Sequence, residues 1–139
     1  MVAVVEAIIT LLCGVGLYAT LFMLAKTRRA QRGELTEPSV VQSPRARLYG
    51  GVPNALIGAI YYPAIAASVW LVRSPVGFGI VAAAVAFAGM TSIVLAYSLL
   101  FVTRRPCPYC WTAHSINWAL VVLVAWLFKM NILSSIHRF

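Results

Sequence analysis

Four apolar segments, each long enough to cross a bilayer as a helix, dominate this sequence. They cover approximately residues 2–25, 53–72, 76–102 and 108–130. A membrane-spanning helix needs about 20 mainly apolar residues. Of the 139 residues, 62% are hydrophobic and only 10% are charged, whereas soluble domains are about half apolar and a quarter charged. The sequence therefore predicts an all-α, multi-spanning membrane protein.

The connections between these segments predict their arrangement. Three of the spans follow one another closely, which favours an antiparallel four-helix bundle and a single membrane domain over residues 1–139. The one long connection, residues 26–52, contains six basic and two acidic residues. With four spans it lies on the same side as the start of the fourth. We expect a lid or partner surface covering that face; the alternative is a disordered basic tether.

The net charge of +8 is carried by basic residues beside the apolar spans. This placement suits contact with anionic lipid headgroups and argues against nucleic-acid binding. The sequence has three cysteines, too few for a disulfide scaffold. Cys13 lies within the first span, where a cysteine in apolar surroundings is usually inert packing.

The other two cysteines, Cys107 and Cys110, stand three residues apart where the fourth span begins. A lone Cys-x-x-Cys pair indicates redox or metal chemistry. The first helical turn, with free N–H groups and the positive end of the helix dipole, favours a thiolate. A redox pair at the mouth of a membrane helix predicts electron exchange with a molecule dissolved in the bilayer.

Two further polar residues, His114 and Asn117, continue the same stripe of the fourth helix. Polar groups in a membrane helix usually face the bundle interior and are functional candidates. His114 could donate to a bound oxygen or be an ordinary interior histidine, and Asn117 is expected to bond across helices. Zinc or copper binding by Cys107, Cys110 and His114 is the competing chemistry. It lacks a fourth ligand, because His137 belongs to the opposite side of the membrane.

Two segments resemble the vitamin K epoxide reductase family. Residues 107–117, with the sequence CPYCWTAHSIN, are similar to the redox motif of that family's last helix. Residues 43–62 are similar to the family's serine-bearing half-helix and the start of its second span. The two motifs occur in the family's order and at the corresponding spans.

The resemblance implies an enzyme that reduces a quinone of the ubiquinone or menaquinone type with electrons from thiols. It thereby forms a disulfide for a thioredoxin-like partner. By position, Cys110 would attack the quinone ring and Cys107 would resolve the pair and exchange with the partner. Asn54 and His114 would hydrogen-bond the two quinone oxygens, and Ser43 matches the family's loop serine. Relatives often carry tyrosine at the position of His114, and histidine titrates near neutrality.

The long connection departs from the family pattern. Relatives carry two shuttle cysteines there, and the corresponding positions fall near Arg29 and Glu37. We therefore expect a dithiol partner to dock directly at Cys107, the sulfur expected to be more accessible, or another chain to supply the shuttle. A non-turnover accessory or quinone-binding subunit is the alternative function.

The distribution of positive charge predicts the orientation in the membrane. Eight basic residues lie on the side of the cysteine pair: Lys26, Arg28, Arg29, Arg32, Arg45, Arg47, Arg104 and Arg105. The opposite side has three: Arg73, Lys129 and Arg138. By the positive-inside rule the active-site face is cytoplasmic, whereas the family's usual orientation is periplasmic or extracytoplasmic. Disulfide formation in a cytosol is unusual outside hyperthermophiles.

Overall fold

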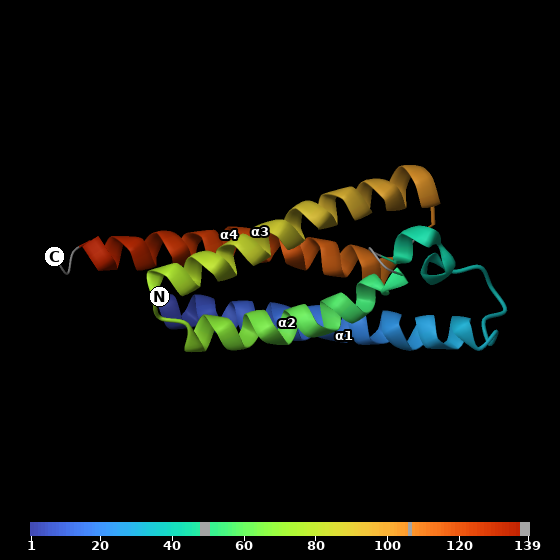
Figure 1. Cartoon of the computed structure of the whole chain (residues 1–139), viewed down its shortest axis with the longest axis horizontal. Coiled ribbons are helices and arrows are strands. Elements are labelled where there is room, and N and C mark those ends of the chain that lie inside the picture. Colours follow the sequence, from blue (N-terminus) through green and yellow to red (C-terminus); the bar gives the residue numbers. More distant parts are fainter. Residues whose placement is uncertain (48–50, 106, 137–139) are drawn as a thin grey trace.

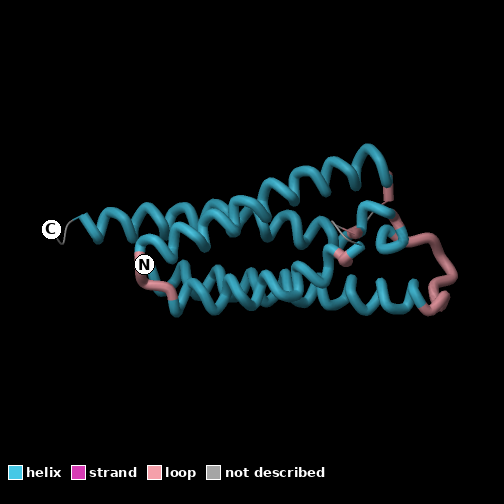
Figure 2. Tube along the Cα trace, in the orientation of Figure 1, coloured by secondary structure: helices cyan, strands magenta, loops and turns pink. Residues whose placement is uncertain are grey.

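Four long helices make up the computed structural model. It describes residues 1–47, 51–105 and 107–136, and for residues 135 and 136 only the backbone is described. They are α1 (Val2–Gln31), α2 (Asn54–Leu71), α3 (Pro75–Tyr97) and α4 (Pro108–Ile136). Each is long and apolar enough to cross a membrane, α3 together with the short helix that follows it. The described residues contain no strand, only an isolated bridge between Arg47 and Pro53 (Figures 1 and 2). The predicted all-α four-helix membrane fold is confirmed.

The helix ends differ from the expected boundaries. Helix α1 continues to Gln31, well past the expected end at residue 25, and α4 continues beyond residue 130. Alanine, lysine and arginine are good helix formers, and Arg28 and Arg29 in the last turn suit the negative end of the helix dipole. Hydropathy marks where a helix leaves the bilayer core, but the backbone stays helical beyond that point.

Helix α3 ends in a π-helix, η4 (Ser98–Thr103). The following residue, Arg104, has a left-handed backbone with φ of 50°, which turns the chain toward the start of α4. Short π-helical segments inside longer helices often occur at functional sites. Here the segment lies at the same end of the bundle as the start of α4 (Figure 1).

Helix α1 packs against α2 and α4, and α3 packs against α4, whereas α2 and α3 make few contacts. Figure 1 shows that α2 and α3 lie together at the end holding the N-terminus and diverge toward the other end. Small residues allow the close α1–α2 approach, since a Cβ at Gly16 would lie 2.5 Å from the ring of Tyr62. The resulting core is centred on Ile9, Tyr62, Val69, Val85, Leu120 and Val124.

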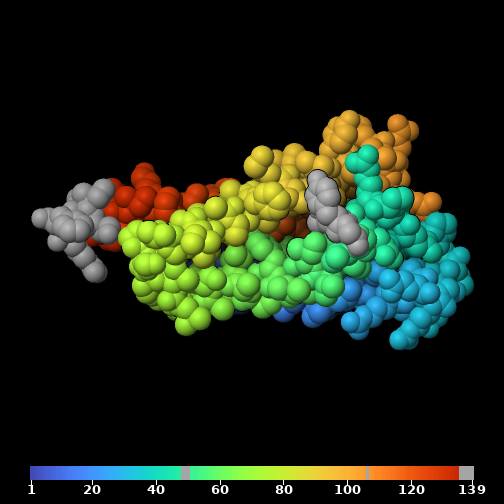
Figure 3. Space-filling model, in the orientation of Figure 1, coloured from blue at the N-terminus to red at the C-terminus, as the bar shows by residue number. Residues whose placement is uncertain are grey.

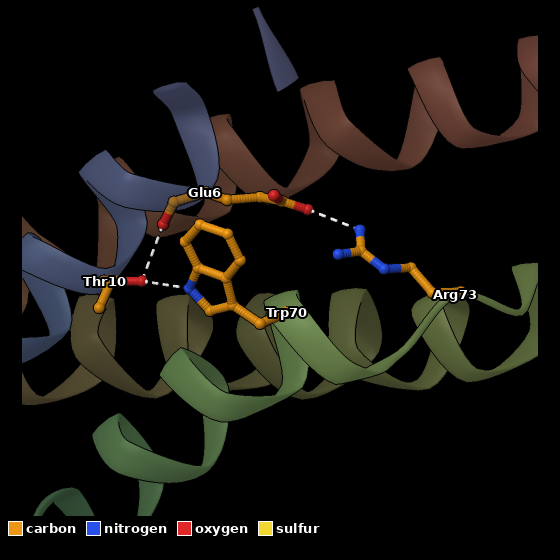
Figure 4. Close-up of polar contacts among 4 residues, drawn as sticks. All are labelled: Glu6, Thr10, Trp70 and Arg73. Atoms are coloured by element: carbon orange, nitrogen blue, oxygen red, sulfur yellow. Dashed lines mark hydrogen bonds and ion pairs between the residues drawn. The ribbon is translucent and has the colours of Figure 1, made fainter. Parts of the chain in front are cut away.

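A polar clamp closes the end of the bundle far from the cysteines (Figure 4). Arg73, in the turn between α2 and α3, bonds the buried carboxylate of Glu6 at 2.9 Å. Thr10 donates to the backbone carbonyl of Glu6, and Trp70 donates to the hydroxyl of Thr10. These bonds hold the first turns of α1 against the end of α2 and the turn that follows it.

The described part of the long connection is folded over the cysteine end. It contains two short 3-10 helices, η1 (Val40–Gln42) and η2 (Pro44–Ala46). Arg105 donates to the carbonyl of Pro38 at 2.9 Å, and Asn54 donates to the carbonyl of Arg45 at 2.9 Å. These bonds tie the segment to the start of α2 and to the residues that precede α4. Residues 48–50 of the 43–62 motif, Pro106, His137 and Arg138 lie outside the described residues.

Candidate active site

Cys107 and Cys110 are joined by a disulfide at the start of α4, with a Cα–Cα distance of 5.3 Å. The backbone N–H of Cys110 donates to Cys107 Sγ at 3.2 Å, and that of Trp111 donates to the Cys107 carbonyl. The first turn of a helix has N–H groups without helical partners. Cys107 therefore occupies the capping position, where negative charge on sulfur would be stabilised.

The two sulfurs have different surroundings. Cys107 is only 7% exposed, with its Sγ 3.9 Å from Met23 Sδ in α1. The neighbouring ring of Tyr109 stacks on Phe22 of α1, with ring centroids 3.9 Å apart. The expectation that Cys107 is the more accessible sulfur is therefore wrong for this structure. The reason is tertiary, because Phe22 and Met23, near the expected end of the first span, pack against the start of α4.

Cys110 instead lines a cavity of about 700 Å³ between the helices and the folded connection. Pockets for small molecules typically have volumes of about 300–1,000 Å³. This cavity extends between α2 and α3 where they diverge, and the space-filling view shows a recess there between the green and yellow surfaces (Figure 3). A bilayer-soluble ligand could thus enter from the side.

Three other residues predicted for the site line the same cavity: Ser43, Asn54 and His114. The structure thus brings together every predicted site residue except Cys107, which lies behind Cys110 and is bonded to it. Ser43 belongs to the long connection, Asn54 to the first turn of α2, and His114 to α4. The surrounding wall is mostly apolar, as suits a ring-shaped ligand with a few polar atoms.

Four buried polar atoms of this wall have no hydrogen-bond partner among the described residues: Ser43 Oγ, Asn54 Oδ1, Tyr61 OH and Ser98 Oγ. Buried polar groups in proteins are nearly always hydrogen-bonded. Four such atoms around one cavity indicate that a polar ligand completes their bonding. Asn54 is held in place by its bond to the Arg45 carbonyl, and its amide retains a second N–H for a ligand. The three hydroxyl groups and the free amide N–H of Asn54 are donors that fit a quinone, whose oxygens accept hydrogen bonds, whereas Asn54 Oδ1 can only accept.

His114 is 8% exposed and has no side-chain hydrogen bond among the described residues. Its ring lies near the indoles of Trp111 and Trp118, with centroids 6.4 Å and 6.5 Å away. These rings fix the histidine by packing and leave its nitrogens free. His114 therefore combines packing against two indoles with a position on the cavity wall.

Asn117 joins three helices. Its amide donates to Ser92 Oγ of α3 at 2.7 Å, and its carbonyl oxygen accepts from Tyr62 of α2 at 3.1 Å. Tyr62 also lies 3.2 Å from the Ala113 carbonyl on α4. The prediction that Asn117 bonds across helices is confirmed. These bonds hold the walls of the cavity together next to His114.

Sequence reasoning did not single out Tyr61 or Ser98. Adjacent tyrosines in a mainly apolar span were a usable signal for Tyr61, because a phenol inside a membrane needs a partner. Ser98 gave no comparable signal, since small residues are common where membrane helices pack.

In the described part of the chain, no three His, Cys, Asp or Glu side chains come together in a way that could hold a metal ion. His137, considered as a distant ligand, lies outside the described residues. Cys13 is buried in the core and is not part of a disulfide, in agreement with the packing role expected for it.

A search of curated proteins finds no match to this chain. Residues 7–125 match the sequence model of the vitamin K epoxide reductase family. This range includes both resembling motifs, α2 and α3 in full, and most of α1 and α4. In general, this family comprises membrane thiol oxidoreductases that act on quinones. Because the match covers most of the chain, and the fold and cysteine pair agree with it, the protein is a member of the vitamin K epoxide reductase family.

Proposed function

We propose that this protein is a thiol:quinone oxidoreductase in which the Cys107–Cys110 pair reduces a quinone of the ubiquinone or menaquinone type. The observation that carries the proposal is the shared cavity, where Cys110 meets Ser43, Asn54 and His114. The free donors there suit quinone oxygens, and the gap between α2 and α3 suits entry from the bilayer.

The chemistry assigned to the cysteines is a two-electron transfer. The thiolate of Cys110, favoured by the first turn of α4, attacks the quinone ring. Cys107 then attacks Cys110 Sγ, which forms the S–S bond and leaves the electron pair on the ring. Asn54 and His114 hydrogen-bond the two ring oxygens as negative charge develops on them. Two protons complete the hydroquinone.

The disulfide is passed to a thioredoxin-like dithiol partner that docks at Cys107 and becomes oxidised. The described connection contains no cysteine, so direct exchange or a shuttle on another chain is required. Since Met23 covers Cys107, docking must displace this part of α1 or the folded connection. The exchange should trap a mixed disulfide through Cys107 when Cys110 is replaced by serine. Trapping through Cys110 alone, in the Cys107→Ser variant, would contradict this route.

A quinone-reductase assay tests the central proposal. Purified protein, a short-chain quinone and excess dithiothreitol should give turnover, followed by quinone absorbance. The Cys110→Ala and Cys107→Ala variants should lose turnover, whereas Cys13→Ala, which alters a core cysteine remote in sequence from the pair, should retain it. Normal turnover by Cys110→Ala would refute the mechanism. Quinone binding without any wild-type turnover would instead support the accessory-subunit alternative.

The active-site face is proposed to be cytoplasmic. The described basic residues support this, because those near the cysteine pair outnumber Arg73 and Lys129 at the opposite end. In a variant without native cysteines, a cysteine at exposed Gln42 should resist a membrane-impermeant maleimide in intact cells. A cysteine at exposed Ser134, near the other end, should react. The reverse pattern would establish the extracytoplasmic orientation.

A further inference from the structure

We propose that the hydroxyl groups of Tyr61 and Ser98 form a second hydrogen-bonding subsite in the cavity, which selects quinones with alkoxy oxygens on the ring over naphthoquinones. This inference rests on the proposed function and specifies the substrate class of the same site. It starts from two hydroxyl groups that have no hydrogen-bond partner in the described part of the chain.

Ser98 differs from most other serines and threonines of the described helices. Seven of these donate to a backbone carbonyl three or four residues earlier: Thr10, Thr20, Thr27, Ser68, Thr91, Thr112 and Ser134. This local bond is the usual way in which a hydroxyl is satisfied inside a helix. Ser98 is only 2% exposed, yet its Oγ has no partner among the described residues and lines the cavity. Its hydroxyl is therefore available to a ligand.

Tyr61 differs in the same way from the tyrosine next to it. The hydroxyl of Tyr62 is bonded to Asn117 and to the Ala113 carbonyl. The hydroxyl of Tyr61 is buried without a partner among the described residues, and Tyr61 lines the cavity. Of two adjacent phenols, one ties helices together and the other is left for the contents of the cavity.

These two hydroxyls belong to a different part of the wall from the groups near the connection. Ser43 precedes α2 and Asn54 begins it, whereas Tyr61 lies about two turns further along α2. Ser98 is at the junction of α3 and η4, on the wall that diverges from α2. The extra donors therefore come from the two helices between which a quinone would enter.

The chemistry of these groups indicates what they bind. In the proposed function, Asn54 and His114 take the two ring carbonyls, so Tyr61 and Ser98 remain for other atoms of the ligand. Alkoxy oxygens accept hydrogen bonds, whereas the fused benzene ring of a naphthoquinone offers only C–H groups. A ligand without acceptors there would leave each hydroxyl unpartnered, and a lost hydrogen bond of this kind corresponds to about a tenfold loss of affinity.

Binding measurements with two quinones test the subsite. Quenching of intrinsic tryptophan fluorescence would report the affinity for a short-chain dimethoxybenzoquinone and for a short-chain naphthoquinone. Trp111 and Trp118 beside His114 make the signal local. Tyr61→Phe and Ser98→Ala should each weaken binding of the dimethoxybenzoquinone about tenfold and leave naphthoquinone binding unchanged. Affinity is the primary readout, because the two quinones differ in reduction potential.

Two matched variants control for general effects of losing a hydroxyl. Thr91→Val alters a cavity-lining hydroxyl of α3 that is already bonded to the Phe87 carbonyl. Tyr97→Phe alters a tyrosine that is 60% exposed outside the cavity. Neither should change the preference between the quinones. Thermal unfolding of all four variants would verify that they fold.

The outcomes separate this inference from the proposed function. The subsite would be overturned if Tyr61→Phe and Ser98→Ala weakened binding of both quinones equally, or weakened binding of neither. The proposed function would still stand in that case if the wild type turned over. If the wild type reduces neither quinone but the variants lose only dimethoxybenzoquinone binding, the subsite stands and the proposed reductase activity fails.

Discussion

Replacing Gly16 with alanine should destabilise the bundle, although alanine is the better helix former. An alanine Cβ at this position would lie 2.5 Å from two ring carbons of Tyr62. That ring is 1% exposed, and its hydroxyl is bonded to Asn117 and to the Ala113 carbonyl. The ring cannot retreat without stretching these bonds, so α1 and α2 must move apart instead.

The expected change in the free energy of unfolding is the difference between two opposing contributions. Overpacking a filled core costs about 1–3 kcal/mol. Replacing glycine by alanine within a helix contributes about 0.5–1 kcal/mol in the opposite direction. The expected net effect is a decrease of about 1–2 kcal/mol in the free energy of unfolding. Gly14 is the matched control on the same helix, because a Cβ there has nothing within 4 Å. Gly14→Ala should therefore be neutral or slightly stabilising.

Unfolding of both variants in mixed micelles, with increasing sodium dodecyl sulfate and followed by circular dichroism, would measure the difference. Quinone affinity should fall with Gly16→Ala, because Tyr62 is bonded to Asn117, which lines the cavity. Equal stability of the two variants would refute the argument that the close α1–α2 approach fixes Tyr62.

Three further variants test other contacts. Arg73→Gln should lower the free energy of unfolding by about 1–2 kcal/mol, because it leaves the buried carboxylate of Glu6 unpaired. The loss stays moderate because Arg73 itself is largely exposed. Replacing Glu6 with glutamine in the same variant should recover part of the loss. Asn117→Ala removes hydrogen bonds to two neighbouring helices. It should lower the free energy of unfolding by about 1–3 kcal/mol in the same assay. An unchanged stability would show that these bonds contribute nothing. Met23→Ala should uncover Cys107 and speed reduction of the disulfide by an excess of dithiothreitol in stopped-flow measurements, whereas an unchanged rate would contradict shielding by α1.

The positions of the four spans could be predicted because transfer of apolar side chains into a bilayer is a local property of the sequence. The cysteine pair at the start of α4 was also predictable, because its three-residue spacing within one helical turn is likewise a local property of the sequence. Helix ends were less predictable. Residues 26–31 remain helical outside the apolar run, because backbone hydrogen bonding does not require an apolar surrounding.

The sequence by itself determined a four-helix membrane protein with a redox pair at one end, and its motifs indicated the family. Only the tertiary structure decided that Met23 covers Cys107 while Cys110 lines the cavity. It also decided that, within the described ranges, the hydroxyls of Tyr61 and Ser98 have no hydrogen-bond partner whereas those of Tyr62 and Thr91 do. The physical reason is that hydropathy specifies the length of a span but not the rotation or separation of helices. Packing between residues distant in the sequence sets these two quantities, and they determine which polar atoms face the cavity.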